Sequence, residues 1–346
     1  LHLSIRRQRQ MCIRDRKYPR WIYPLTLGLA LSFYATVATG KYHEWTESRD
    51  IYGLQVLSSH NPIGAAQFIQ DNKIQGRCFS DYLTSSYLLW KLQPEFKTFI
   101  DLRDLDIFST EFFSEFINMT AIPAEFEAKD DSLNFDYVVL FRPQFSGLHR
   151  HLVESSEYDL VFADPVACVY LKKIPKNEAI IAKYGFVANG FKDIFSPLNP
   201  VQSTVIPYTI SKILNPLYRP TDYADTDIDA IASSFYLSLK QINLAINRAN
   251  ASVQSSKEPW GGNELLGNIY NNYAFAPETV DSLRKGYIQK ANYHYDQALA
   301  ANPNYVGAII GKATISMQQQ NFQNAINYYN RVLEIEPENA TAIQYM

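Results

Sequence analysis

The chain has 346 residues, a length that suggests roughly two or three domains. Hydrophobic residues make up 47% of it and charged residues 19%, a composition that excludes an intrinsically disordered chain. The mean hydropathy of −0.22 argues against several membrane spans, and the net charge of −3 gives a nucleic-acid partner no electrostatic support.

The beginning of the chain differs in character from the rest. Residues 7–16 read RQRQMCIRDR, which resembles a translated sequencing adapter. We therefore interpret residues 1–16 as a non-native leader and exclude them from the fold reasoning. The alternative is a genuine basic arm beside a membrane.

Residues 21–40 contain no charged side chain, and a helix of this length would span the roughly 30 Å of a hydrocarbon core. The pattern predicts one transmembrane helix, with residues 17–42 as a membrane anchor in contact with the lipid bilayer. Lys17 and Arg20 precede the span, so the N-terminal flank is expected in the cytoplasm. The bulk of the chain would then be extracytoplasmic, on a bacterial inner membrane. A cleaved signal peptide and a buried helix are the alternatives.

Residues 43–174 alternate between helical and strand-like patterns and are expected to form a small α/β module. Helices between strands indicate a mostly parallel sheet with an antiparallel edge. The last two strands are expected to form a hairpin that turns at Asp164 and Pro165. The segments with strand character are Arg77–Ser80, Lys97–Ile100, Phe135–Phe141, Leu160–Phe162 and Val166–Leu171.

The stretch 62–104 resembles the extracytoplasmic domain of C-type membrane glycosyltransferases, the family that uses polyprenyl-phosphate sugars. Glycines of that family's pattern are replaced here by Ser85, Ser86 and Leu102. The resemblance implies a relationship to the appended domain and not to the catalytic part, which lies between earlier spans. A polyprenyl-phosphate sugar is therefore implied only for a longer protein. The residues that match the pattern are Asp81, Tyr82, Tyr87, Leu88, Trp90, Asp101 and Arg103.

Four charged residues follow predicted strands, namely Asp81, Asp101, Arg103 and Asp104. Ligands of open α/β sheets collect at the carboxyl ends of strands, so these residues are candidates for contacts with a saccharide or a lipid phosphate. The alternative is structural: the aspartates cap turns or helices, and Arg103 pairs with a neighbouring carboxylate.

No catalytic motif for phosphate, dinucleotide, zinc-peptidase or serine-hydrolase chemistry occurs, and we predict no catalytic residue, metal or cofactor. His149 and His151 lie about 200° apart on a helix, so we expect solvated histidines and not a shared metal site. Cys78 and Cys168 lie in predicted strands of one module. They could form a disulfide outside the cytosol or remain buried thiols.

Residues 175–224 hold six of the seventeen prolines and are predicted to form a connector. From Asp225 onward the pattern becomes helical, and residues 225–346 are predicted to form an α-helical domain. Its first helix is expected to place one set of apolar residues on a single face. These residues are Ile228, Ile231, Phe235, Leu239, Ile242 and Ile246.

Pro303 and Pro337 lie 34 residues apart, which is the tetratricopeptide period. Small residues occur at the expected helix crossings, Ala313 and Ala325, and Tyr329 occupies the aromatic position. The preceding segment repeats this phase at Ala291 and Tyr295. Residues 306–337 therefore resemble a tetratricopeptide repeat closely, and we expect an α-helical solenoid of such repeats.

The first helix of each repeat lines a groove that suits a protein or peptide partner. Four residues are expected to project into it: Ile310, Thr314, Met317 and Gln318. The expected fold is thus a membrane-anchored chain with an α/β module and a helical solenoid. The expected function is a non-catalytic interaction module. The alternative is the C-terminal fragment of a membrane glycosyltransferase, so whether a longer protein is an enzyme stays open.

Overall fold

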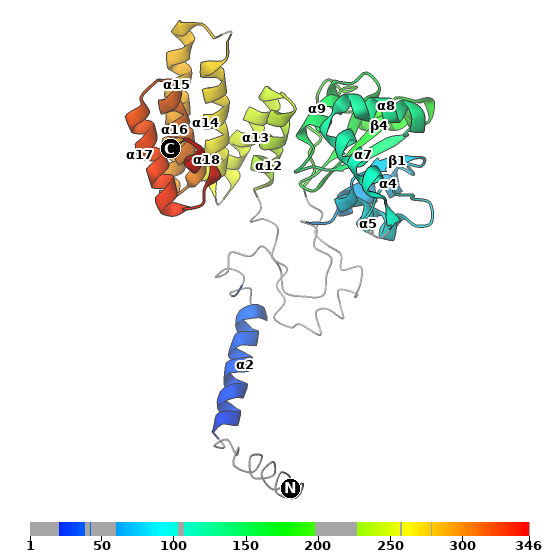
Figure 1. The fold of residues 1–346 in the computed structure, drawn as a ribbon, viewed down its shortest axis with the longest axis horizontal. Coiled ribbons are helices and arrows are strands. Elements are labelled where there is room, and N and C mark those ends of the chain that lie inside the picture. The colour runs from blue at the N-terminus through cyan, green and yellow to red at the C-terminus, as the bar shows by residue number, and fades with distance from the viewer. Residues whose placement is uncertain are drawn as a thin grey trace, which may run out of the picture. The chain divides into compact units, whose positions relative to one another are not determined.

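The computed structural model describes residues 21–38, 42, 60–102, 107–197, 227–256, 258–277 and 279–345. The described residues fall into two compact units, one with α2 and the other with the α/β module and the helical region (Figure 1). The leader at residues 1–16 and most of the connector lie outside the described residues.

The predicted transmembrane helix is wrong. The helix there, α2 (Ile22–Ala38), has 17 residues, which at 1.5 Å per residue gives about 26 Å, less than a hydrocarbon core. Among the described residues, none of the helices combines the length and the apolar character that a membrane crossing needs. The proposed contact with a lipid bilayer loses its basis. The expected placement outside the cytoplasm rested on that span and stays an untested prediction.

The α/β module contains a four-stranded sheet in the order β1-β2-β4-β3. β1 and β2 are parallel, whereas β4 is antiparallel to both β2 and β3. The prediction of a mostly parallel sheet is therefore wrong, because the β3–β4 hairpin places its second strand in the middle and Lys97–Ile100 forms no strand. The strands are β1 (Cys78–Ser80), β2 (Tyr137–Phe141), β3 (Tyr158–Ala163) and β4 (Ala167–Lys172).

The hairpin turn at Asp164 is confirmed. The Asp164 carboxylate accepts hydrogen bonds from the backbone N–H groups of Val166 at 2.7 Å and Ala167 at 2.8 Å. An aspartate that bonds to the backbone two and three residues on stabilises a tight turn. The sequence order Asp-Pro therefore fixes where β3 ends and β4 begins.

Helices of the module pack on this sheet (Figure 1). Four of them, α4, α5, α7 and α9, lie where the sequence has a helical pattern. α8 was missed because its sequence is mostly polar and buries only Phe126 and Asp130. α10 lies within residues 175–224, which were predicted as a connector. The helices of the module are α4 (Ile63–Asp71), α5 (Tyr82–Leu92), α7 (Thr110–Ala121), α8 (Pro123–Leu133), α9 (Ser146–Glu154) and α10 (Glu178–Tyr184).

The helical region is a row of antiparallel helical hairpins. The predicted first helix is two helices, α12 and α13, because Lys240 adopts a left-handed conformation with φ 58° and reverses the chain. The helices are α12 (Ile228–Ser238), α13 (Ile242–Ser255), α14 (Pro259–Phe275), α15 (Asp281–Ala301), α16 (Val306–Gln318), α17 (Phe322–Ile335) and α18 (Ala340–Tyr345).

The first helices of successive hairpins touch one another. α12 packs on α13 and α14, α14 packs on α15 and α16, and α16 packs on α17. The first helices α12, α14 and α16 thus form one layer, and the second helices pack against its back. This alternating order is the arrangement of a helical solenoid.

Candidate functional site

The hairpin α16–α17 is held by small residues where its helices cross. Ala313 and Ala325 are fully buried, and the ring of Tyr329 fills the space beside them. A small side chain at each crossing lets the backbones approach closely, and the aromatic ring occupies the remaining volume. The predicted packing of this repeat is confirmed.

The hairpin α14–α15 is packed in the same way, with small residues around an aromatic ring. Ala291, Tyr295 and Ala298 of α15 are fully buried. A Cβ atom added to Gly267 of α14 would lie 2.6 Å from Cδ1 of Tyr295, so only glycine fits against this ring. The Tyr295 hydroxyl donates a hydrogen bond to Oδ1 of Asn268 at 2.7 Å.

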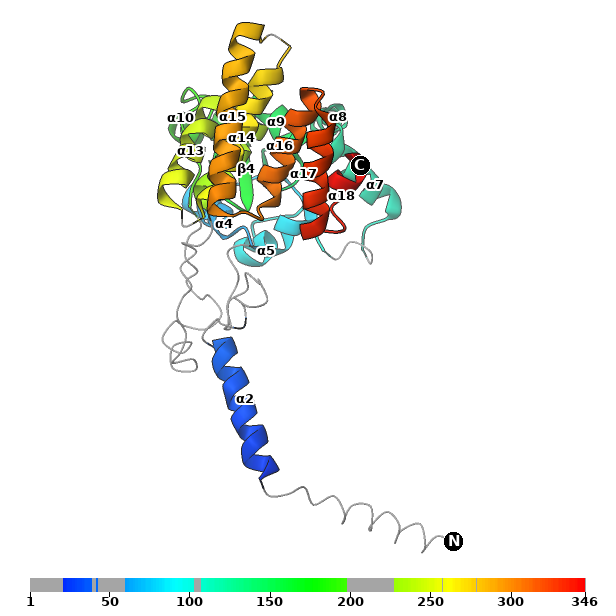
Figure 2. The same ribbon diagram turned by 90° about the vertical axis from the view of Figure 1, so that its left-hand side faces the viewer.

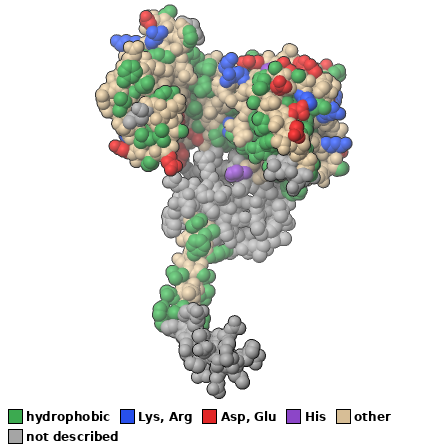
Figure 3. All heavy atoms as spheres, in the orientation of Figure 1, with side chains coloured by type: hydrophobic (Ala, Val, Ile, Leu, Met, Phe, Trp, Pro, Cys, Tyr) green, Lys and Arg blue, Asp and Glu red, His purple; other side chains and the backbone are tan. Residues whose placement is uncertain are grey.

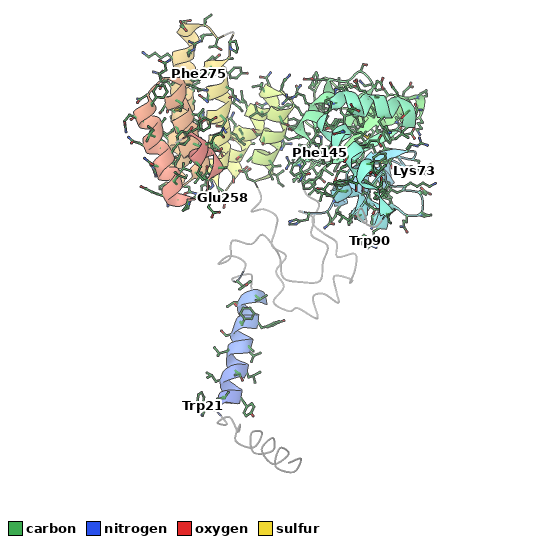
Figure 4. The ribbon with its side chains drawn as sticks, in the orientation of Figure 1. Trp21, Lys73, Trp90, Phe145, Glu258 and Phe275 are labelled. Carbon is green, nitrogen blue, oxygen red and sulfur yellow. The ribbon has the colours of Figure 1, made fainter. Side chains whose placement is uncertain are left out.

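The sequence analysis missed Gly267 because its spacing is unusual. Gly267 precedes its partner Ala291 by 24 residues, whereas Ala313 precedes Ala325 by 12. The extra residues lengthen α14 and α15, and the hairpin extends past its neighbours in both ribbon views (Figures 1 and 2). Phe275 marks its tip in Figure 4, and Glu258 lies at the opposite end of α14.

The hairpin α12–α13 has the turn geometry of α16–α17. Lys240 and Gln320 both have positive φ angles, 58° and 61°. In each turn the next N–H donates to a carbonyl five residues back at 2.8 Å, Gln241 to Tyr236 and Asn321 to Ser316. Three helical hairpins therefore stand in a row before α18, and the first and third share one turn geometry.

The comparison with protein families agrees with this geometry. Residues 283–346 match the family model described as Tetratricopeptide repeat. This end of the chain is a tetratricopeptide repeat region. The comparison with curated proteins found no match. The resemblance of residues 62–104 to a glycosyltransferase domain is therefore unsupported.

The four predicted groove residues differ in accessibility. Ile310 and Met317 are half-buried against the cluster around Ala325. Thr314 is half-buried and donates its hydroxyl to the carbonyl of Ile310 at 2.9 Å. Burial raises the pKa of Tyr329, and a hydrogen bond with Thr314 lowers it in part, so these side chains meet. Gln318 is exposed and is the most accessible of the four.

The layer of first helices is almost uncharged. Across α12, α14, α16 and α18, the described residues include a single basic side chain, Lys312, which forms an ion pair with Asp296 of α15. Both acidic side chains of these helices are engaged internally: Asp229 pairs with Arg248 at 2.6 Å, and Glu264 accepts the Tyr305 hydroxyl at 2.6 Å. On the face in view in Figure 3, the helical region is largely tan and green, with charge near its ends.

Of the charged residues predicted to contact a ligand in the α/β module, Asp81 has a structural role. Asp81 is buried at the start of α5, where its carboxylate accepts from the N–H groups of Leu83 and Thr84. It also accepts from the N–H of Phe141 in β2 at 2.6 Å. Asp81 therefore caps α5 and ties it to the sheet, although burial raises the pKa of its carboxyl group.

Asp101 is also buried, in the loop before α7, and it makes contacts of its own. Arg103 and Asp104 lie outside the described residues. Whether Asp101, Arg103 and Asp104 contact a ligand stays a prediction.

The two cysteines are free and buried, so the alternative of a disulfide between them is wrong. Burial raises the pKa of Cys78 and that of Cys168 well above the usual range of a thiol. Inert thiols inside a core fit a structural role.

The expectation of solvated histidines fails for His149, which is buried under the helical region, while His151 is partly exposed and lies 3.2 Å from Glu127. In the ranges that the structure describes, no group of three His, Cys, Asp or Glu side chains could hold a metal ion.

An acidic pocket of about 410 Å³ lies between α8, α9 and the start of β3. Two lysines offset part of the charge of its five carboxylates. Lys172 pairs with Asp130 at 2.9 Å and with Glu157 at 3.6 Å, and Lys240 pairs with Glu154 at 3.4 Å.

Proposed function

We propose that the tetratricopeptide region binds a segment of a partner protein on the layer formed by its first helices. The observation that carries this proposal is the hairpin packing around Tyr295 and Tyr329, together with the family match of residues 283–346. Stacked hairpins of this kind present one continuous layer of helices, and such a surface suits a peptide or a helix.

The chemistry of this layer indicates an uncharged partner segment. A partner with acidic side chains would need basic residues to meet it, and the basic side chain of these helices is already paired. Half-buried Ile310 and Met317 offer apolar contact, while Thr314 and Gln318 offer hydrogen-bonding groups beside them. The affinity is therefore expected to depend weakly on salt.

The α/β module is proposed to act as the cap of the first hairpin. Phe186 and Phe195, from the end of the module, join Phe235 and Tyr236 of α12 in one core cluster. A solenoid needs a terminal element that covers the apolar side of its first repeat. In this proposal the module supports the binding layer and takes no part in binding.

The test is a selection of peptides on the full chain, followed by two matched glutamine variants. Random 15-residue peptides displayed on phage are selected for binding, and the affinity of each selected peptide is measured by titration calorimetry. Gln318→Arg, at the end of α16, should lower that affinity by about tenfold, or 1.4 kcal/mol. Gln323→Arg, at a position that is also exposed but lies on the second helix α17, should leave it unchanged. Failure to select any peptide, or equal effects of the two variants, would contradict the proposal.

A further inference from the structure

A buried joint connects the α/β module to the helical region. The rings of Phe186 and Tyr236 stack with their centroids 5.8 Å apart. The Tyr236 hydroxyl donates to Asp193 at 2.7 Å and accepts from the N–H groups of Ile194 and Phe195. We call this contact between residues 186–195 and α12 the joint.

His149 of α9 is buried beside the joint and faces α12. Its Nδ1 lies 2.7 Å from the hydroxyl oxygen of Tyr170, and its Nε2 lies 3.4 Å from the carbonyl oxygen of Phe141. The ring of Phe235, from α12, meets the imidazole edge to face at a centroid distance of 6.1 Å. The helical region thus covers this histidine.

The hydrogen bonds of His149 are satisfied by a neutral ring. A carbonyl oxygen can only accept, so the hydrogen of His149 belongs on Nε2, and Nδ1 accepts from the Tyr170 hydroxyl. A second proton on Nδ1 would point at the hydroxyl hydrogen of Tyr170. That hydroxyl would have to rotate, and the buried ring would carry a charge.

Burial and the charge of Arg142 disfavour a protonated His149, whereas backbone hydrogen bonds with Phe141 and Gln144 favour it in part. Arg142, at the end of β2, is a cation, and β4 presents the neutral side chains of Cys168 and Tyr170. α12 presents the apolar ring of Phe235. On α9 itself, Arg150 donates to the carbonyl of Ser238 at the end of α12. His151, two residues from His149, lies 3.2 Å from Glu127.

We propose that the joint is an acid-sensitive contact, which opens when His149 takes up a proton and releases α12 from the α/β module. Burial, with a smaller contribution from the charge of Arg142, lowers the pKa of His149 from 6.5 to about 4. An exposed histidine titrates near 6.5. In the open joint His149 therefore binds a proton at a higher pH than it does in the closed joint.

The direction and size of the effect follow from this difference. The contribution of neutral His149 to the stability of the closed joint is complete above pH 6.5. It is lost as the pH falls from 6.5 toward 4, and below pH 4 it changes no further. At pH 5.5 the open form gains about tenfold in population relative to pH 7.5.

Hydrogen exchange on the full chain tests the proposal. After correction for the intrinsic exchange rates, protection of α12 should fall about tenfold between pH 7.5 and 5.5, while the β3–β4 hairpin keeps its protection. His149→Gln, whose amide can also donate and accept, should remove the pH response. His151→Gln, two residues away on the same helix, should retain it.

Two results would overturn the proposal. One is a pH response of α12 that persists in His149→Gln. The other is a loss of protection in the β3–β4 hairpin together with α12, since that would be unfolding of the module. If His149→Gln does not fold, the ring resonances of the wild-type chain decide, because titration of His149 near 6.5 without any change in α12 also overturns it.

Discussion

Gly267 and Gly286 provide a matched test of the close packing in the elongated hairpin. Both glycines lie inside helices, α14 and α15, where alanine is favoured over glycine by about 1 kcal/mol. At Gly286 nothing lies within 4 Å of an added Cβ, so Gly286→Ala should stabilise the protein by about that amount.

At Gly267 the same methyl group would strike the ring of buried Tyr295. Overpacking of a tight core costs about 1–3 kcal/mol, and displacing the ring also endangers its hydrogen bond to Asn268, worth about 1 kcal/mol. After the gain in helix propensity, Gly267→Ala should destabilise by about 1–3 kcal/mol, which places the two variants about 2–4 kcal/mol apart.

Urea unfolding of the two variants, followed by far-ultraviolet circular dichroism, measures this difference. The midpoint should fall for Gly267→Ala and rise for Gly286→Ala. Equal midpoints would mean that α14 does not approach Tyr295 closely, and the assignment of α14–α15 as a repeat hairpin would fail.

The other predictions concern the last hairpin, the joint and the thiols. Ala325→Leu should lower the free energy of unfolding by about 1–3 kcal/mol through overpacking, while exposed Ala300→Leu should stay within about 0.5 kcal/mol in the same urea assay. Arg248→Met removes the ion pairs of its guanidinium with two aspartates, and thermal unfolding should show a loss of about 1–3 kcal/mol; an unchanged midpoint would refute the role of this contact. Maleimide should label Cys78 and Cys168 only after unfolding, and rapid labelling of either of these two residues in the native chain would contradict their burial.

The repeat could be found from the sequence because its signal is local. Ala313, Ala325 and Tyr329 recur within one period, and each residue type is dictated by the space between two neighbouring helices. Gly267 obeys the same rule, but the longer helices of its hairpin break the period. The role of Gly267 could not be found from spacing alone, and it becomes visible only in its contact with Tyr295 in the structure.

The α/β module was harder to predict because its sheet depends on distant pairings. β1 has only three residues, and nothing in the sequence places β4 between β2 and β3. The uncharged run at residues 21–40 suggested a membrane span, but the helix ends at Ala38. His149 was expected in solvent because it is covered by Phe235 of α12, which is 86 residues away along the chain.

The proposal that the first helices bind a partner segment is tested most directly by a hydrogen-exchange footprint. A peptide selected on the full chain is added at saturation, and exchange is compared with that of the free protein. The account predicts added protection in α14 and α16, around Thr314 and Gln318, with the outer helices α15 and α17 unchanged. Protection confined to α15 and α17, or to the α/β module, would contradict it.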